Sequence, residues 1–139
     1  MSDLSAAESA KTHVSLGITH VLSVMPGNVL LPKTGGPSLK TLQIPIRDTP
    51  FEELAAHLGR TSAFIADALC ARGSVLVHCV QGMSRSASVV AAYLMATKGW
   101  SVREAVDFVR SRCSTAQPNS GFLSQLQEYY DALRQRAAR

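Results

Sequence analysis

The chain has 139 residues, 46% of them hydrophobic, and this length predicts one domain with a single hydrophobic core and no second module. Its formal net charge of +4 comes from basic residues scattered along the chain, with a cluster only at the predicted last helix, so we expect no nucleic-acid partner. The longest apolar stretch, residues 87–96, is far shorter than the roughly 20 residues of a membrane-spanning helix, so we expect no membrane partner.

The first part of the chain is predicted to contain a helix and a strand. Residues 4–16 are rich in alanine, have helical spacing and end at Gly17, which favours a helix. Residues 18–24 predict a buried strand. Residues 25–38 contain three prolines and three glycines and therefore predict a long loop.

The next segments predict a second strand and a long helix. Residues 39–46 alternate between apolar and polar side chains, and Pro45 indicates an edge strand or a distortion. Residues 49–52 are Thr-Pro-Phe-Glu, which is typical of a helix start, because the threonine can cap, the proline fits the first helical position and the glutamate completes a capping box. This helix is predicted to run to about residue 72 and to end at Gly73.

A third strand at residues 74–77, a loop and three helices complete the predicted elements. The helices are expected at residues 85–98, 101–113 and 120–136, the second of them opened by a Ser-Val-Arg-Glu capping box. Strands that alternate with helices predict an α/β fold, with a parallel-rich central sheet flanked by helices. The loops after the three strands then open on one edge of the sheet, where we expect the active site.

The loop after the third strand carries the strongest chemical signal. Residues 78–86 are His-Cys-Val-Gln-Gly-Met-Ser-Arg-Ser, so that five residues separate Cys79 from Arg85. Backbone N–H groups in such a turn, together with the N-terminus of the next helix, can bind an anion. The Arg85 guanidinium can donate hydrogen bonds to two phosphate oxygens. A Cys79 thiolate beneath a bound phosphoryl group is placed to attack its phosphorus atom as a nucleophile.

An ordinary buried thiol is the alternative interpretation of Cys79. It is disfavoured because the pattern H-C-x-x-G-x-S-R-S has six fixed positions and lies between a predicted strand and a predicted helix.

These residues resemble the signature of the cysteine-dependent protein phosphatases, in their dual-specificity branch. Residues 92–95 (Ala-Tyr-Leu-Met) and 118–123 (Pro-Asn-Ser-Gly-Phe-Leu) are similar to two further hallmarks of this family. The resemblance covers residues 16–130 and implies a protein-phosphatase-like fold. Residues 1–7 resemble the stretch that follows the family's first strand, so we expect that strand to be missing, the sheet to be smaller and one edge to be exposed.

Phosphomonoester cleavage needs a nucleophile, charge stabilisation and a proton for the leaving oxygen. Cys79 is predicted to form a cysteinyl-phosphate, and Ser86 is placed to donate a hydrogen bond to its thiolate. The transferring group is predicted to be held by the Arg85 side chain and by the backbone of the loop, that is, by Val80, Gln81, Gly82, Met83, Ser84 and Arg85.

Asp48 is our candidate for the catalytic acid, since it follows the second strand and so lies on the same edge of the sheet. The alternative is a turn residue before a capped helix. Other aspartates of the chain (Asp67, Asp107 and Asp131) fall inside predicted helices. The resemblance supports Asp48, because the family carries its acid in the corresponding loop, and the same carboxylate can then activate the hydrolytic water.

Other polar residues are predicted to support the site. His78 is expected to organise the loop through hydrogen bonds, and no second histidine lies at ligand spacing, so we expect no metal and no cofactor. Asn119 resembles a family position that braces the phosphate loop, and a cap of the last helix is the alternative. Arg47 and Arg112 are candidates for a further anion contact, with a solvated surface position as the alternative.

The resemblance implies a protein phosphatase that accepts phosphotyrosine and phosphoserine or phosphothreonine in a phosphorylated protein substrate. A phosphoinositide or RNA phosphatase is disfavoured, because the loop interior has no lysine to meet extra phosphates. A phosphoprotein-binding adaptor would be expected to have lost the nucleophile, the arginine or the acid. Three cysteines without a secretion signal favour a reducing compartment, hence a cytoplasmic or nuclear protein, and no feature fixes the oligomeric state.

Overall fold

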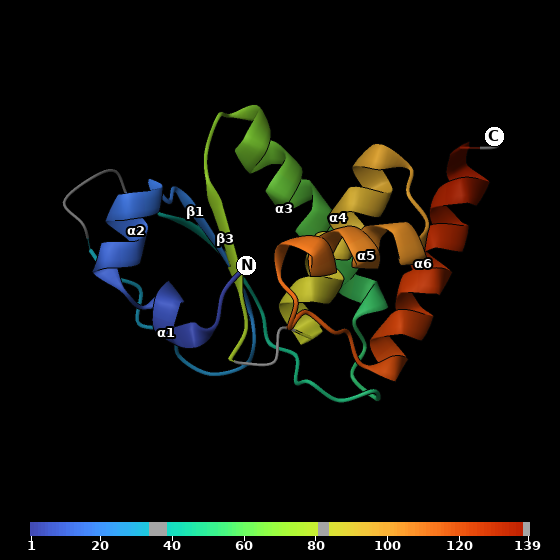
Figure 1. Cartoon of the computed structure of the whole chain (residues 1–139), viewed down its shortest axis with the longest axis horizontal. Helices are drawn as coiled ribbons and strands as arrows, with labels where there is room; N and C mark the ends of the chain where they lie inside the picture. The colour runs from blue at the N-terminus through green and yellow to red at the C-terminus, as the bar shows by residue number, and fades with distance from the viewer. Residues whose placement is uncertain (34–38, 81–83, 138–139) are drawn as a thin grey trace.

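A parallel three-stranded sheet organises the molecule (Figure 1). The computed structural model describes residues 1–33, 39–80 and 84–137. The strands are β1 (His20–Val24), β2 (Lys40–Ile44) and β3 (Val75–His78), and their order in the sheet is β2-β1-β3. Both pairings are parallel, which confirms the predicted sheet type and brings the carboxyl ends of all three strands to one edge.

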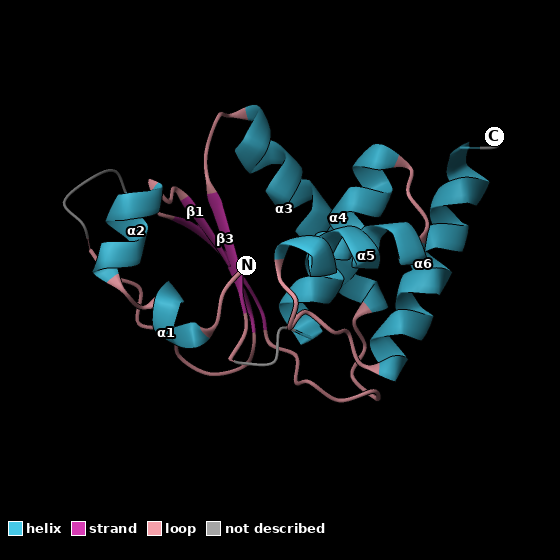
Figure 2. Ribbon diagram, viewed as in Figure 1, coloured by secondary structure: helices cyan, strands magenta, loops and turns pink. Residues whose placement is uncertain are grey.

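Helices cover the two faces of this sheet unequally (Figures 1 and 2). One face carries two short helices, α1 (Leu4–Ala7) and α2 (Ala10–Leu16). The other face carries the larger layer, formed by the 3-10 helix η1 (Ala55–His57), α3 (Leu58–Cys70), α4 (Ser84–Lys98), α5 (Val102–Arg112) and α6 (Ser120–Ala137). No described helix has both the length and the apolar character to span a bilayer.

The alternation of side chains along the strands divides the core into two clusters. Leu22 and Val77 point to the larger helical layer, where they join a cluster that includes Phe122 and Leu126 of α6. Val21 and Leu76 point the other way and pack against Ala7 of α1 in a much smaller cluster. Most of the apolar burial that stabilises the fold therefore lies on the side of α3 to α6.

The helix predicted over residues 4–16 is wrong as a single element. The structure breaks it after Ala7, and Ser9 caps a second helix by accepting a hydrogen bond from the Thr12 N–H at 3.3 Å. A serine side chain competes well for such an N-cap position, and alanine-rich spacing alone does not reveal the break. The predicted end is confirmed, since Gly17 adopts a left-handed φ of 62°.

The helix predicted to start at residues 49–52 is also wrong. The Glu52 carboxylate accepts the N–H of Arg47 at 3.0 Å instead of completing a capping box with Thr49. An irregular segment and η1 follow, and the long helix α3 begins only at Leu58. The residues around Pro50 are instead held against α6, as described below.

The end of α3 lies close to the predicted glycine. Arg72 takes the left-handed conformation, with φ 59°, and the Gly73 N–H donates to the Ala68 carbonyl at 2.9 Å. A Cβ atom at Gly73 would lie 2.5 Å from Oγ1 of Thr19. Glycine is therefore required here by close packing against the segment before β1 rather than by its backbone angle.

The remaining predicted helices and the end of β2 agree with the structure. Helix α5 begins with the complete Ser101–Glu104 capping box, and α4 ends before Gly99, whose φ is 70°. Strand β2 stops directly before Pro45 and forms one edge of the sheet, as a proline after an edge strand suggests.

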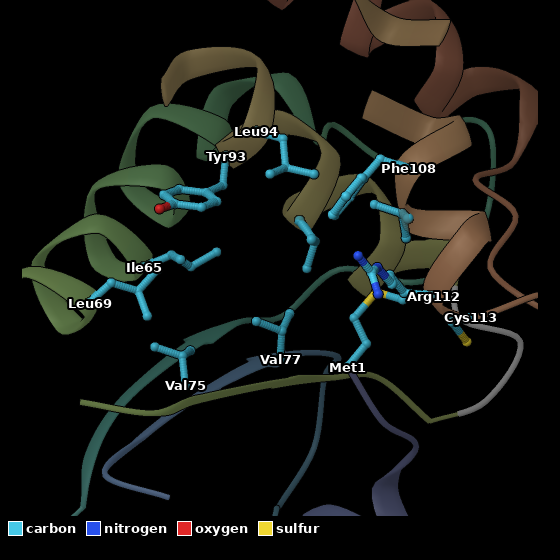
Figure 3. A pocket seen from close by; sticks show the side chains of 12 residues that line it. Met1, Ile65, Leu69, Val75, Val77, Tyr93, Leu94, Phe108, Arg112 and Cys113 are labelled. Atoms are coloured by element: carbon cyan, nitrogen blue, oxygen red, sulfur yellow. The ribbon is translucent and has the colours of Figure 1, made fainter. Parts of the chain in front are cut away.

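Opposite β1, the outer edge of β3 has an isolated bridge and no strand among the described residues. Ser2 forms an isolated parallel bridge with His78, and its N–H donates to the Val77 carbonyl at 2.9 Å. Among residues 1–33, 39–80 and 84–137, β1 is the only strand that pairs with β3. A largely apolar cavity of about 350 Å³ lies beside this edge, lined by residues of β3, α3, α4 and α5 and by Met1 (Figure 3).

Candidate active site

Cys79 directly follows β3, at the carboxyl edge of the sheet, and its side chain is fully buried. Its Sγ atom lies 3.4 Å from Oγ of Ser86, which is also fully buried in the first turn of α4. The structure therefore brings together the predicted nucleophile and the predicted hydroxyl partner. A hydroxyl group at this distance can donate a hydrogen bond to sulfur.

The loop between Cys79 and Arg85 is described at its two ends. Val80 is partly exposed, and its carbonyl accepts the Leu4 N–H at 3.2 Å. Ser84 is buried at the start of α4. The predicted phosphate-binding residues between them, Gln81, Gly82 and Met83, lie outside the described residues.

Arg85 is buried next to this loop, with only 7% of the residue exposed. Its Nη1 atom donates to the carbonyl of Ile46 at 3.2 Å, which ties it to the segment after β2. Its Nε–H has no hydrogen-bond partner among the described residues. A buried guanidinium with a spare donor is chemically suited to an oxyanion, because such donors are otherwise paired in folded proteins.

Asp48 lies in the exposed segment after β2, and its Oδ1 atom accepts a hydrogen bond from Nδ2 of Asn119 at 2.9 Å. The backbone N–H of Asn119 donates in turn to Oγ of Ser84 at 2.9 Å. Two hydrogen bonds thus connect the predicted acid with the first residue of α4. This connection brings the segment after β2 and the start of α4 together.

Asn119 makes hydrogen bonds at the start of α6 and to the segments that carry Asp48 and Ser84. Its Oδ1 atom accepts the Phe122 N–H at 2.8 Å and so satisfies a free donor in the first turn of α6. Its Nδ2 atom and its backbone N–H donate to Asp48 and Ser84. One residue therefore caps α6 and joins Asp48 to the first residue of α4, and its role as a brace of the loop stays a prediction.

His78 precedes the nucleophile and is fully buried. Its Nε2 atom lies 2.7 Å from Oγ of Ser23 in β1, and its Nδ1 atom lies 3.3 Å from the Cys79 carbonyl oxygen. Burial lowers the pKa of His78 below its usual value, against the hydrogen bond to the Cys79 carbonyl and nearby carboxylates, which raise it. One ring nitrogen thus contacts the neighbouring strand β1 and the other contacts the backbone of Cys79; the organising role of His78 stays a prediction.

The two candidate arginines outside the loop have other contacts. Arg47 is exposed, and its backbone N–H is the group bound by Glu52. The Arg112 guanidinium lies 5.3 Å from the centre of the Phe108 ring, and both residues line the apolar cavity beside β3 (Figure 3). Residues 1–33, 39–80 and 84–137 contain no cluster of three or more histidine, cysteine or acidic side chains that could hold a metal ion.

Some residues that shape the site were missed in the sequence. Ser23 pairs in register with His78, and a polar residue near the carboxyl end of a buried strand was the available signal. Gln125 of α6 contacts the segment that carries Asp48. It is separated from this segment by about 70 residues, and no local pattern indicates the contact.

The amino-acid sequence is similar to those of dual specificity phosphatases. Residues 3–132 match the family model described as the catalytic domain of dual specificity phosphatases. Dual specificity phosphatase 28 of Homo sapiens is 45% identical over 102 residues, which cover 73% of this chain and 58% of the human protein.

Solved structures are similar over almost the whole chain. The crystal structure of human DUSP28 has a TM-score of 0.87 at 37% identity, and the match covers 98% of this chain and 93% of the other. A human tyrosine phosphatase-like serine/threonine/tyrosine-interacting protein has a TM-score of 0.86 at 34% identity, with 97% and 91% covered.

Proposed function

This chain belongs to the dual specificity phosphatase family, and we propose that it hydrolyses phosphotyrosine and phosphoserine or phosphothreonine in proteins through a cysteinyl-phosphate on Cys79. The observation that carries this proposal is the hydrogen-bonded path from Asp48 through Asn119 to Ser84. It links a carboxylate to the start of the helix whose first turn also bears the partner of Cys79.

In the first step, the Cys79 thiolate attacks phosphorus as the bond to the leaving oxygen breaks, and Asp48 gives that oxygen a proton. Arg85 offsets the charge on the equatorial oxygens, together with the N–H groups of the loop. The buried Nε–H of Arg85, which has no hydrogen-bond partner among the described residues, supports this assignment. The products of the step are the dephosphorylated alcohol or phenol and the cysteinyl-phosphate.

In the second step, water attacks the cysteinyl-phosphate and Asp48 takes up the proton of that water. The phosphorus–sulfur bond breaks, inorganic phosphate is released and the thiolate returns. The Ser86 hydroxyl, 3.4 Å from the sulfur, can stabilise the departing thiolate with a hydrogen bond. No step requires a metal or another cofactor.

The proposed substrate is a phosphorylated protein, and the proposed site of action is the cytoplasm or the nucleus. None of the three cysteines, all of them among the described residues, is joined in a disulfide, which agrees with a reducing compartment. Part of the loop expected to border the site, residues 34–38, lies outside the described residues.

A phosphoprotein-binding adaptor is the main rival, because one similar structure is that of a phosphatase-like protein named for interaction rather than for catalysis. Fold similarity therefore does not distinguish turnover from binding. The presence of Cys79, Arg85 and Asp48 in this chain favours turnover, since a binding protein needs neither a nucleophile nor an acid.

The decisive experiment compares Cys79→Ser with Cys70→Ser, a matched change at the exposed thiol in the last turn of α3. Hydrolysis of para-nitrophenyl phosphate is measured with a reductant and a chelator. We expect Cys79→Ser to lose at least about 1000-fold in kcat, because the covalent step is removed, and Cys70→Ser to stay near wild type. Cys79→Ser should still bind phosphate or tungstate in a calorimetric titration.

Two results would contradict the proposal. Metal-free activity that survives in Cys79→Ser would exclude this sulfur as the nucleophile. A wild-type chain that binds phosphopeptides without hydrolysing them or the aryl phosphate would favour the adaptor.

A further inference from the structure

Residues 47–54 form an irregular segment between β2 and η1, which we call the acid loop because it carries Asp48. Internal hydrogen bonds within it are few. The Arg47 N–H donates to the Glu52 carboxylate at 3.0 Å, the Glu52 N–H donates to the Thr49 carbonyl at 3.3 Å, and the Leu54 N–H donates to the Glu52 carbonyl at 3.1 Å. The position of Asp48 therefore depends on what holds the acid loop from outside.

Gln125 of α6 holds the end of the acid loop and the start of η1 with the oxygen and the nitrogen of its side-chain amide. Its Oε1 atom accepts the Ala55 N–H at 2.8 Å, and its Nε2 atom donates to the Glu52 carbonyl at 2.8 Å. A side-chain amide is suited to this contact, because it donates and accepts at once. The Glu52 carbonyl therefore accepts two hydrogen bonds, one from Gln125 and one from the Leu54 N–H.

A second contact lies one turn earlier on the same face of α6. A Cβ atom at Gly121 would overlap the backbone of Pro50, so this glycine lets the acid loop lie directly on the helix. Asn119, at the start of α6, makes the third contact through Asp48 itself. One helix therefore holds the acid loop at its beginning, its middle and its end.

We infer that Gln125 is a positioning residue for the catalytic acid. The inference rests on the proposed role of Asp48 and deepens it. The Asn119 hydrogen bond holds the exposed carboxylate itself, whereas the Gln125 contact holds the backbone near the end of the segment that carries it. A displacement of about 1 Å at a catalytic group can cost up to two orders of magnitude in rate, so a remote contact of this kind has a kinetic effect.

The test uses Gln125→Met, which keeps the length of the side chain and removes both polar atoms. Gln127→Met on the same helix is the matched control, because the exposed Gln127 side chain donates to Asp131 at 3.1 Å and has no hydrogen bond to the acid loop. Both variants and the wild-type chain are assayed with aryl phosphates whose leaving groups range from very acidic to weakly acidic.

We expect kcat/KM of Gln125→Met to fall about 10-fold for phenyl phosphate and less than about 2-fold for a dinitrophenyl phosphate, because general acid catalysis matters most for a basic leaving oxygen. Gln127→Met should follow the wild type throughout. In an Asp48→Ala background, Gln125→Met should cause no further loss, since the two changes act on one function.

A purely structural role for Gln125 predicts a different result. Equal losses for all leaving groups, or losses that multiply with those of Asp48→Ala, would overturn the inference. The same conclusion follows if Gln125→Met behaves like Gln127→Met while Asp48→Ala still shows the leaving-group dependence.

A further variant and a wild-type control distinguish a failure of folding and a failure of the proposed phosphatase function from a failure of the inference. If Gln125→Met does not fold, as judged by circular dichroism, Gln125→Glu replaces it, because a glutamate still accepts from Ala55 and cannot donate to Glu52. We expect a smaller loss of the same kind for that variant. If the wild-type chain does not hydrolyse even the dinitrophenyl phosphate, the proposed phosphatase function itself fails, and the inference fails with it.

Discussion

His78 connects the nucleophile to the sheet, and its hydrogen bonds define which nitrogen carries the proton. A carbonyl oxygen only accepts, so Nδ1 is the nitrogen that donates to the Cys79 carbonyl, and in the neutral ring Nε2 then accepts from the Ser23 hydroxyl. The neutral imidazole in this tautomer has both nitrogens satisfied. A charged ring in the same buried place would be poorly solvated, which is why burial lowers the pKa of His78.

This residue should make the fold sensitive to mild acid. The unfolded chain takes up the His78 proton below about pH 6.5, while the folded chain does so only at lower pH, so stability falls as pH drops from about 6.5 through the folded pKa. We expect the melting temperature to fall over this range, and His78→Gln to reduce the fall. His57→Gln, at a half-buried histidine of η1, is the control. An unchanged pH dependence in His78→Gln would exclude His78 as the cause.

The residues of the site differ in how far the sequence could reveal them. His78, Cys79, Arg85 and Ser86 belong to one short motif, so their proximity follows from local geometry. Asp48 was chosen by its place after a strand, and its hydrogen bond to Asn119, 71 positions later, depends on packing between α6 and the acid loop. Sequence patterns record which residue types are present but not which distant segments touch.

At the scale of elements, two similar sequences both predict a capping box at a helix start, but only one of them forms it. Ser-Val-Arg-Glu at residues 101–104 forms the complete box at the start of α5, whereas Thr-Pro-Phe-Glu at residues 49–52 does not. In the second case the Glu52 carboxylate is used by the Arg47 N–H, and the Glu52 carbonyl is used by Gln125. The Gln125 contact comes from α6, 73 positions away, so a local window of sequence does not show it.

The intact box should contribute to stability without affecting the site. We expect Ser101→Ala to lower the free energy of unfolding by about 1 kcal/mol, because the Glu104 N–H at 3.2 Å loses its partner. Hydrolysis of an aryl phosphate should not change. Urea unfolding measures the effect, with Ser111→Ala near the other end of α5 as the control. Equal stability of the two variants would show that the box contributes nothing.

At the scale of the whole molecule, the sheet separates a large core from a small one. Helices α3 to α6 share the larger apolar cluster with one face of β1 and β3. Fewer residues, namely Ala7, Val21 and Leu76 with three partly buried neighbours, form the smaller cluster on the side of α1 and α2. The sequence predicted helices on both faces of the sheet, but it did not reveal that one cluster is much smaller. The predicted helix over residues 4–16 breaks after Ala7 into two short helices, α1 and α2, and the sequence pattern did not show this break.

Hydrogen exchange should therefore be uneven across the molecule. We expect backbone amides of α2 to exchange at least about 100-fold faster than those in the middle of α4, because local opening costs less where few apolar contacts are lost. Mass spectrometry of peptic fragments resolves the two helices. Equal protection of α2 and α4 would mean that the two clusters open together.

Because the two clusters differ in size, the part of the molecule that unfolds most easily is not the part that carries the proposed site. Cys79, Arg85 and the acid loop, which form the proposed site, are anchored to α4 and α6, so we expect α2 on the opposite flank to unravel and re-form without stopping the proposed hydrolysis. A heated sample would then lose part of its helical ellipticity before it loses any rate.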